Sequence, residues 1–337
     1  MEKIRLGLAS PGIWGSNIIK ASKESSSVEI VACSSRRVET ARKAAEAFGI
    51  KAVASYEDLL AEDIQGVIIA SPHSEHLDQT RLAAQAGKHV LIEKPIANTA
   101  KEAKKMVAAC EKAGVVLSIG HSQRRLAGPR TLKRLFESGE YGNPVNAVAY
   151  VGLQGIDMYG TNHWLLNGET NPGGSLYMMG VHFVETFQYL IGPITSVGGM
   201  VVRDLKGTTI PEIAGGIFQF EKPCLGYLGS HYIAPYNSTA SFYCEKAIFH
   251  MEKFGRELYI QDSAFPTIER RPFPLDATPY DNPVLEELEE FGLCIREGKQ
   301  PETGAVEAIS ALAAVQGLMV SAKEHRMIDL AEIIAKY

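Results

Sequence analysis

A glycine-rich turn near the start of the chain follows a predicted strand at Ile4–Ala9 and leads into a predicted helix. In this context, the free backbone N–H groups of the helix start can bind the pyrophosphate of a dinucleotide. Gly12 would let the backbone approach the phosphates, and Gly15 would let the helix pack closely on the strand. Ser10 occupies the position of the usual first glycine. An ordinary strand–turn–helix corner is the alternative. The turn predicts a dinucleotide site that contains Ser10, Gly12, Ile13 and Trp14.

The second predicted strand, Val28–Cys33, ends in two hydroxyl and two guanidinium side chains. A site that prefers NAD places Asp or Glu here to accept a hydrogen bond from the ribose 2′-hydroxyl, but no carboxylate precedes Glu39 in this segment. Arginine can bind a 2′-phosphate through paired hydrogen bonds. A solvated helix start is the alternative, although cations there oppose the helix dipole. The segment predicts NADP rather than NAD, bound by Ser34, Ser35, Arg36 and Arg37.

A lysine follows the fourth predicted strand, Val90–Ile92, in the tripeptide Glu93-Lys94-Pro95. Ligands of open α/β sheets bind outside the carboxyl ends of the strands. Beside a bound nicotinamide, the Lys94 ammonium could orient a substrate hydroxyl or carbonyl and stabilise charge on its oxygen. Lys94 is therefore a candidate catalytic and substrate-binding residue, with an exposed loop lysine as the alternative.

Paired glycines, Gly173 and Gly174, precede a predicted helix that carries His182 and Glu185. Glycines let a ligand approach the backbone closely, and residues three apart share one face of a helix. A histidine has an unperturbed pKa of about 6.5 and suits a general base. His182 is therefore a candidate catalytic and substrate-binding residue, with a buried core histidine as the alternative.

The elements that would position these residues change in type along the chain. Up to Gly120, apolar runs alternate with helical segments, which predicts a parallel sheet covered by helices on both faces. From about residue 143, β-rich segments joined by short turns predict a mostly antiparallel, open sheet. Helical spacing recurs at Gly180–Leu190, Val284–Arg296 and Ala305–His325. The predicted fold class is thus α/β, followed by α+β.

The composition argues against several classes of protein. The 337 residues carry a net charge of −5, which disfavours a nucleic-acid or anionic-membrane partner. No run approaches the ~18 uninterrupted apolar residues of a membrane span, and the strand-like pattern starts so early that we expect no signal peptide. Five scattered cysteines without a CxxC pair predict reduced thiols in the cytoplasm and no metal site.

In this order and spacing, the motifs resemble the Gfo/Idh/MocA family of nicotinamide-dependent oxidoreductases. The resemblance covers essentially the whole chain. It rests on Glu93-Lys94-Pro95 with its lead-in Ala86–Val90, on Ser71-Pro72-His73-Ser-Glu-His76, on Gln123-Arg124-Arg125, and on the paired glycines before His182.

The resemblance implies an N-terminal Rossmann domain at residues 1–122. It also implies a substrate-binding and oligomerisation domain at 123–337, with an open sheet that commonly forms the interface of a homo-oligomer (dimer or tetramer) and C-terminal helices that pack back on the first domain. Lys94 would match the lysine beside nicotinamide and substrate, and His182 the histidine that exchanges the substrate proton. The bond before Pro95 would be cis, as in relatives. Further residues would line the dinucleotide: Ser71, Pro72, His73, His76, Glu93 and Gln123.

Two positions depart from the family pattern. Many dehydrogenases of the family carry Asp four residues before the histidine, where this chain has Met178. A thioether cannot accept a proton, so His182 loses an activating partner. Trp164-Leu165 stands where relatives often show Trp-Arg. Substitute polar contacts to the substrate could come from Asp157, Tyr159, His163 or Tyr177.

The sequence therefore predicts an NADP(H)-dependent oxidoreductase. It would transfer a hydride between nicotinamide and a carbinol or carbonyl carbon of a sugar-like or cyclic polyol substrate. One alternative is a lyase or hydrolase that uses bound NAD(P) for transient oxidation, which Met178 favours. The other is a non-catalytic, NAD(P)-sensing regulator, against which the retention of Lys94 and His182 counts.

Overall fold

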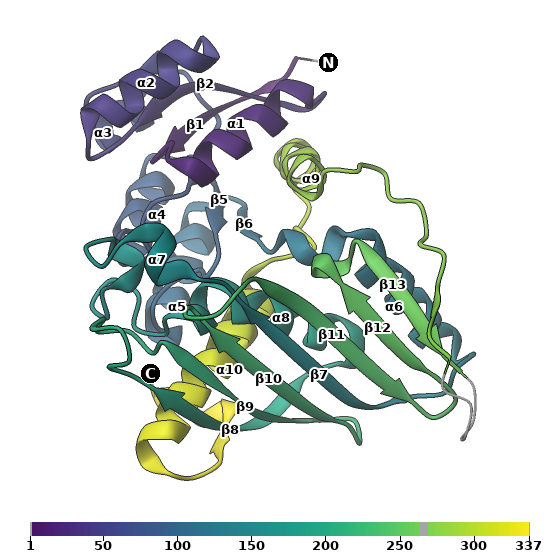
Figure 1. Ribbon diagram of the computed structural model, residues 1–337. Helices are drawn as coiled ribbons and strands as arrows, with labels where there is room; N and C mark the ends of the chain where they lie inside the picture. The colour runs from purple at the N-terminus through teal and green to yellow at the C-terminus, as the bar shows by residue number, and fades with distance from the viewer. Residues whose placement is uncertain (1, 263–268, 337) are drawn as a thin grey trace. The chain divides into compact units, whose positions relative to one another are not determined.

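The computed structural model describes residues 2–262 and 269–336, and the chain divides into two compact units (Figure 1). Unit 1 contains the residues up to Ala97, Lys101–Ser122 and Asn282–Ala308. Unit 2 contains Asn98–Ala100, Gln123–Asp281 and the residues from Ile309 onward. A segment from near the C-terminus therefore belongs to the same unit as the N-terminal sequence.

The strands of unit 1 are β1 (Ile4–Ala9), β2 (Val28–Ser34), β3 (Lys51–Ala52), β4 (Gly66–Ile69), β5 (His89–Glu93) and β6 (Leu117–Gly120). They form one parallel sheet in the order β3-β2-β1-β4-β5-β6. Strands β4 and β6 are buried at every position, as expected where helices cover both faces. This order is typical of doubly wound dinucleotide-binding sheets, and the predicted α/β class is confirmed.

The helices of unit 1 are α1 (Ile13–Glu24), α2 (Val38–Phe48), α3 (Tyr56–Ala61), α4 (His76–Gln85), α5 (Ala100–Ala113, in unit 1 from Lys101) and α9 (Pro283–Glu297). Local signals set several of their ends. Ser55 and Asp58 form a capping box at the start of α3. At α9, the Asn282 side chain accepts from the Val284 N–H, and Pro283 takes the first helical position.

The strands of unit 2 are β7 (Pro144–Gly152), β8 (Ile194–Val202), β9 (Ile213–Phe220), β10 (Leu225–His231), β11 (Asn237–Cys244), β12 (Ile248–Glu252), β13 (Glu257–Gln261), β14 (Arg271–Pro272) and β15 (Ile328–Asp329). They pair in the order β14-β13-β12-β11-β7-β10-β9-β8-β15, as Figure 1 shows for the longer strands. Only β7 and β10 pair in parallel among these described strands. The predicted mostly antiparallel sheet is confirmed. The two-residue strands of this sheet, β14 and β15, and β3 of unit 1 are too short to give a periodic pattern in the sequence.

The helices of unit 2 are α6 (Ala127–Ser138), α7 (Gly155–Tyr159), α8 (Val181–Ile191), α10 (Ala305–Glu324, in unit 2 from Ile309) and α11 (Leu330–Lys336). Helix α10 is long and apolar enough to cross a membrane by composition, but more than half of that window, 56%, is buried inside the protein. Gly199 on β8 lets α10 pack closely against this strand. Any other residue at position 199 would place its Cβ only 2.2 Å from the Leu318 carbonyl oxygen. Helix α10 is therefore a core helix of this unit.

The two faces of the unit 2 sheet differ in exposure. Fully buried aromatic side chains, including Phe187, Phe218 and Phe242, lie on the covered face. On the opposite face, Tyr227 pairs with Val148 on β7 and with Ile217 on β9, and directly paired residues share one face of a sheet. We call this opposite surface the apolar sheet face; its exposed residues are Val148, Tyr150, Met200, Val202, Ile217, Leu225, Tyr227 and Tyr243.

A single carboxylate holds the turn between α1 and β2 in unit 1. Glu289 on α9 accepts hydrogen bonds from the hydroxyls of Ser25, Ser26 and Ser27 and from the N–H groups of Ser26 and Ser27. Although burial opposes it, this set of donors lowers the pKa of Glu289 to about 2. The carboxylate therefore joins the C-terminal segment of unit 1 to its N-terminal part.

We predict that Glu289→Gln lowers the free energy of unfolding by about 2 kcal/mol at pH 7, because an amide cannot replace the charge-assisted bonds. Because the pKa falls from 4.5 to about 2 on folding, the contribution is complete above pH 4.5 and is lost as the pH falls toward 2. Urea denaturation should show the difference from wild type shrinking over that range.

The matched control is Glu297→Gln, an exposed residue at the end of the same helix that pairs with Lys299. We expect this variant to change the free energy of unfolding by less than about 0.5 kcal/mol. An equal loss in both variants, or a loss in Glu289→Gln that does not depend on pH, would contradict the assignment.

Candidate functional site

The first βα turn adopts the backbone conformation that its sequence requires. Ser10 has a φ of 65°, in the left-handed region that glycine occupies most easily. Its N–H donates to the Ser34 carbonyl, and its carbonyl accepts from the Gly12 N–H, both at 2.8 Å. A Cβ at Gly15 would lie 2.7 Å from the Ser10 carbonyl oxygen. The turn thus keeps the dinucleotide-binding geometry with serine at the first position.

The start of α1 fits a phosphate group. Gly12 is the N-cap of α1, and no side chain among the described residues caps it. A Cβ built at Gly12 would meet nothing within 4 Å in the described part of the chain. Next to it, Ile13 is 83% exposed and Trp14 is 42% exposed. Uncapped N–H groups beside open space suit the pyrophosphate of a dinucleotide.

The end of β2 presents the predicted hydroxyl and guanidinium groups at the same edge of the sheet. Ser34 is buried, Ser35 is half-buried, and Arg36 and Arg37 are exposed. Arg37 is the N-cap of α2 and makes no side-chain capping bond. Two cations at a helix N-terminus are unfavourable by themselves. They would be stabilised by an anion such as a phosphate.

The segment after β4 is held by two buried histidines. The His76 ring nitrogens lie 3.0 Å from the carbonyl oxygens of Ile96 and Ser71, and burial lowers its pKa to about 4. The Ser71 hydroxyl donates to the Gln79 side chain at 2.6 Å. Burial, and then the charges of His76 and Lys94, lower the pKa of His73. His76 thus ties the Ser71–His76 segment to the chain after β5. Pro72, within this segment, is half-buried.

Glu93 and Lys94 form a charged pair at the carboxyl end of β5. Burial raises the pKa of Glu93, while Lys94 and a hydrogen bond from Trp14 oppose this rise. The Trp14 indole Nε1 donates to Glu93 Oε1 at 2.5 Å. Burial lowers the pKa of Lys94, and the Glu93 carboxylate opposes this fall. The bond between Lys94 and Pro95 is cis, as expected.

The Trp14–Glu93 contact brings two predicted cofactor-binding residues together. Trp14 lies in the turn after β1, and Glu93 ends β5. No local pattern indicated that these residues, 79 positions apart, share a hydrogen bond. The structure therefore links the glycine turn to the residue next to Lys94.

In unit 2, His182 follows an irregular turn of helix. Leu176–Gly180 forms a π-helical turn directly before α8, a feature that is frequent at functional sites. His182 and Met178 are both half-buried. The His182 ring meets the edge of Phe254 at a centroid distance of 6.2 Å. The sequence indicated neither the π-helical turn nor Phe254.

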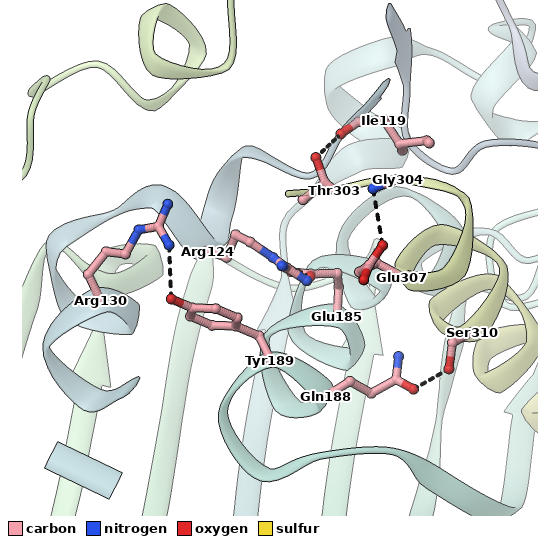
Figure 2. A network of polar contacts seen from close by, with 10 residues as sticks. All are labelled: Ile119, Arg124, Arg130, Glu185, Gln188, Tyr189, Thr303, Gly304, Glu307 and Ser310. Atoms are coloured by element: carbon pink, nitrogen blue, oxygen red, sulfur yellow. Dashed lines mark hydrogen bonds and ion pairs between the residues drawn. The ribbon is translucent and has the colours of Figure 1, made fainter. Parts of the chain in front are cut away.

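Glu185 is committed to an ion pair, as Figure 2 shows. The Nε and Nη2 atoms of Arg124 donate to Glu185 Oε1, and both side chains are buried. The Arg124 guanidinium also lies 4.6 Å from the centroid of the Tyr189 ring. Arg130 donates to the Tyr189 hydroxyl at 2.9 Å. Glu185 thus joins α8 to Arg124 within this buried network.

The other predicted residues of unit 2 have distinct surroundings. The Tyr177 hydroxyl donates to the Asn98 carbonyl at 3.0 Å, and the residue is 2% exposed. Tyr159 stacks on His163 with ring centroids 4.9 Å apart, and the His163 Nδ1 accepts from the Leu165 N–H. Asp157 is exposed. Tyr159 and His163 thus form a stacked aromatic pair.

Gln123 is the predicted cofactor-binding residue that lies in unit 2. It is 3% exposed, and neither its amide oxygen nor its amide nitrogen has a hydrogen-bond partner among residues 2–262 and 269–336. A buried amide with two unused hydrogen-bonding atoms is costly without a ligand. Among the same residues, no group of His, Cys, Asp and Glu could hold a metal ion.

Two successive segments of the chain match models of one known family. Residues 5–121 match the GFO_IDH_MocA oxidoreductase family with an NAD-binding Rossmann fold. Residues 130–250 match the GFO/IDH/MocA C-terminal domain. The two matches lie in the order that the sequence motifs indicated.

Individual relatives agree with these matches. A D-apiose dehydrogenase from Paraburkholderia graminis is 25% identical over 100% of this chain and 92% of its own length. A 1,5-anhydro-D-fructose reductase from Ensifer adhaerens is 33% identical over 48% of this chain and 49% of its own length. The first comparison spans nearly the whole of both proteins.

Solved structures share the fold over nearly the whole chain. One from Desulfitobacterium hafniense, described as a candidate NADPH-dependent oxidoreductase, has a TM-score of 0.92 and 25% identity and covers 99% of both chains. A levoglucosan dehydrogenase in complex with NADH and levoglucosan has a TM-score of 0.88 and 19% identity, covering 98% of this chain and 100% of its own.

Proposed function

Because the chain belongs to the GFO/IDH/MocA family of oxidoreductases, we propose that it transfers a hydride between NADP(H) and a carbinol or carbonyl carbon of a sugar-like or cyclic polyol substrate. The observation that carries the proposal is the Glu93–Lys94 pair at the carboxyl end of β5, linked through Trp14 to the glycine turn. Dehydrogenases of D-apiose and levoglucosan among its relatives support the substrate class.

The cofactor is held by groups at the carboxyl edge of the unit 1 sheet. The start of α1 binds the pyrophosphate through its N–H groups, and Ser71 and Glu93 lie at the ends of neighbouring strands. The exposed side chains of Ile13 and Trp14 would contact the dinucleotide. Gln123 would supply a further amide. A bound nicotinamide would supply hydride transfer to or from the substrate carbon.

Lys94 and His182 perform the work on the substrate oxygen. In the oxidative direction, the His182 imidazole accepts the hydroxyl proton as the carbon loses its hydride. The Lys94 ammonium donates a hydrogen bond to the same oxygen and stabilises its developing negative charge. The Glu93 carboxylate helps Lys94 keep its proton despite burial. In the reductive direction, His182 returns the proton. Tyr159, His163 and Tyr177 belong to the substrate side of unit 2.

NADP is favoured over NAD by the charge at the end of β2. Ser34 and Ser35 offer hydroxyls, and the exposed Arg36 and Arg37 offer guanidinium groups at the uncapped start of α2. A 2′-phosphate accepts hydrogen bonds from both types of group. A carboxylate, which would select the unphosphorylated ribose, is absent between Ser34 and Arg37.

A homo-oligomer, dimer or tetramer, would cover the apolar sheet face. The eight exposed residues of this face, which include Tyr150, Ile217 and Tyr227, lie on five adjacent strands, β11, β7, β10, β9 and β8. Large exposed apolar surfaces are typical of interfaces, and an identical copy offers a complementary one.

A cytoplasmic location fits the five free thiols, and fractionation of the native cell checks it.

We predict that Lys94→Ala and His182→Gln each reduce kcat at least about 100-fold, because each removes a group that acts on the substrate oxygen. Absorbance at 340 nm reports turnover with D-apiose, levoglucosan or 1,5-anhydro-D-fructose and the matching oxidised or reduced cofactor. The Kd of NADPH should change less than about 3-fold in His182→Gln. Full activity in both variants would contradict the assigned roles.

Substrate consumption without a lasting change at 340 nm would instead support the redox-neutral alternative that Met178 favours.

For the cofactor, we predict that Arg36→Ala raises the Kd of NADP⁺ about 30-fold and leaves the Kd of NAD⁺ nearly unchanged. The loss of a charge-assisted hydrogen bond to phosphate, about 2 kcal/mol, gives this factor. Titration calorimetry measures both constants. Arg42→Ala, an exposed residue on the same helix, is the control and should alter neither constant. Equal affinity of the wild type for NAD⁺ and NADP⁺ would overturn the NADP assignment.

For the oligomer, we predict that Ile217→Glu and Tyr227→Glu reduce the molar mass in solution to the 36.7 kDa of one chain, because a charge buried in an apolar interface is costly. Light scattering after size-exclusion chromatography measures the mass. Leu293→Glu, an exposed apolar residue of α9 outside this face, should leave the mass unchanged. A wild type that is monomeric at micromolar concentration would refute the proposal.

A further inference from the structure

The hairpin loop between β12 and β13 has an unusual backbone. Its first three residues, Lys253, Phe254 and Gly255, have φ values of 50°, 61° and 104°. Glycine tolerates such values, but other residues lose roughly 1–2 kcal/mol in the left-handed region. A bulky residue such as phenylalanine is rarely found there. The loop therefore carries strain that the surrounding structure must offset.

Close packing within unit 2 holds the loop in this conformation. The Phe254 N–H donates to the Ser238 hydroxyl at 3.2 Å. Gly255 contacts the start of α6, where a Cβ at Gly128 would lie 2.5 Å from the Gly255 carbonyl oxygen. A Cβ at Gly255 would in turn lie 2.5 Å from Pro129. The loop is thus fixed by a hydrogen bond and by two glycines that allow close approach.

The strained conformation directs the Phe254 ring toward the start of α8. The ring stacks on Phe183 at a centroid distance of 5.8 Å and an interplanar angle of 24°. It meets the His182 ring edge to face, at 6.2 Å and 73°. Tyr236 closes a further side at 6.3 Å. Phe254 thus lies between two aromatic rings and packs against the imidazole of His182.

His182 has an aromatic neighbour on the side of the hairpin loop. Met178, four residues earlier, offers a thioether, and the Glu185 carboxylate is bound by Arg124. A proton-exchanging imidazole must keep a defined ring orientation, because small misplacements of a reacting group reduce the rate strongly. Contact with a fixed aromatic ring restricts that orientation.

We propose that Phe254 is a positioning residue for His182: the strained hairpin loop holds its ring against the imidazole and so orients the group that exchanges the substrate proton. The inference rests on the proposed function, because it assigns Phe254 a role through His182. It also explains why a left-handed position carries phenylalanine in place of glycine or asparagine.

The backbone conformation makes a clean test possible. Phe254→Gly and Phe254→Asn remove the ring but place residues at position 254 that adopt a positive φ easily. Both variants should remain folded with a cooperative thermal transition, because relief of the backbone strain offsets part of the packing lost with the ring. Their kcat should fall about 10-fold or more, while KM for the sugar and Kd for NADPH change less than about 2-fold. Phe254→Tyr, which keeps the ring, should retain at least half of the wild-type kcat. His325→Gly, at another exposed residue with positive φ (54°), is the matched control and should leave kcat unchanged.

A second measurement does not depend on turnover. Diethyl pyrocarbonate modifies imidazoles, and mass spectrometry of peptides reports the rate at His182 alone. Removal of the covering ring in Phe254→Gly should increase this rate several-fold, and Phe254→Tyr should match the wild type.

The outcomes separate the inference from the proposed function. An inactive His182→Gln together with a fully active Phe254→Gly overturns the inference and leaves the proposed function intact. A raised KM with unchanged kcat in Phe254→Gly also overturns it, because the ring would then contact the substrate itself. A modification rate of His182 that does not change in Phe254→Gly overturns it as well. If His182→Gln is fully active, both proposals fail.

Discussion

The charge on the Glu93 carboxylate is the feature on which the arrangement of unit 1 depends. A carboxylate that is only 7% exposed is stable as an anion only where other groups replace water. Trp14 supplies one hydrogen bond from the glycine turn, and Lys94 supplies a positive charge from the next position in the chain. The same carboxylate therefore ties the turn after β1 to the end of β5 and favours the protonated form of half-buried Lys94. This edge of the sheet thus brings the glycine turn and the Glu93–Lys94 dipeptide together.

Unit 2 positions its candidate catalytic group differently. A thioether occupies position 178, Arg124 binds Glu185, and the Phe254 ring packs against His182. The π-helical turn at Leu176–Gly180 changes the direction of the chain immediately before this histidine. The charge of Glu93 acts on Lys94 in unit 1, and the Phe254 ring packs against His182 in unit 2. Both arrangements restrict the geometry of a reacting group, which is a main source of catalytic rate.

Successive side chains of the unit 2 strands point to opposite faces of the sheet, so the two faces can differ in burial. Alternate residues of β7, β9 and β10 are buried under helices, and the residues between them remain exposed. Apolar side chains at those exposed positions would be unfavourable in a monomer and favourable in an interface. The alternation that builds the core thus also presents the surface through which copies of the chain would associate.

The sequence by itself determined the features that depend on neighbouring residues. Apolar runs separated by helical segments indicated the parallel sheet. Three candidate segments could be located because each follows the end of a predicted strand: Ser10–Gly15, Ser34–Arg37 and Lys94. Tertiary structure alone decided their partners: Trp14 with Glu93, Arg124 with Glu185 and Phe254 with His182, which are 79, 61 and 72 residues apart. Strand and helix periods report which face of one element is buried. They carry no information about which side chain of a distant element meets that face, because that contact depends on how the elements pack.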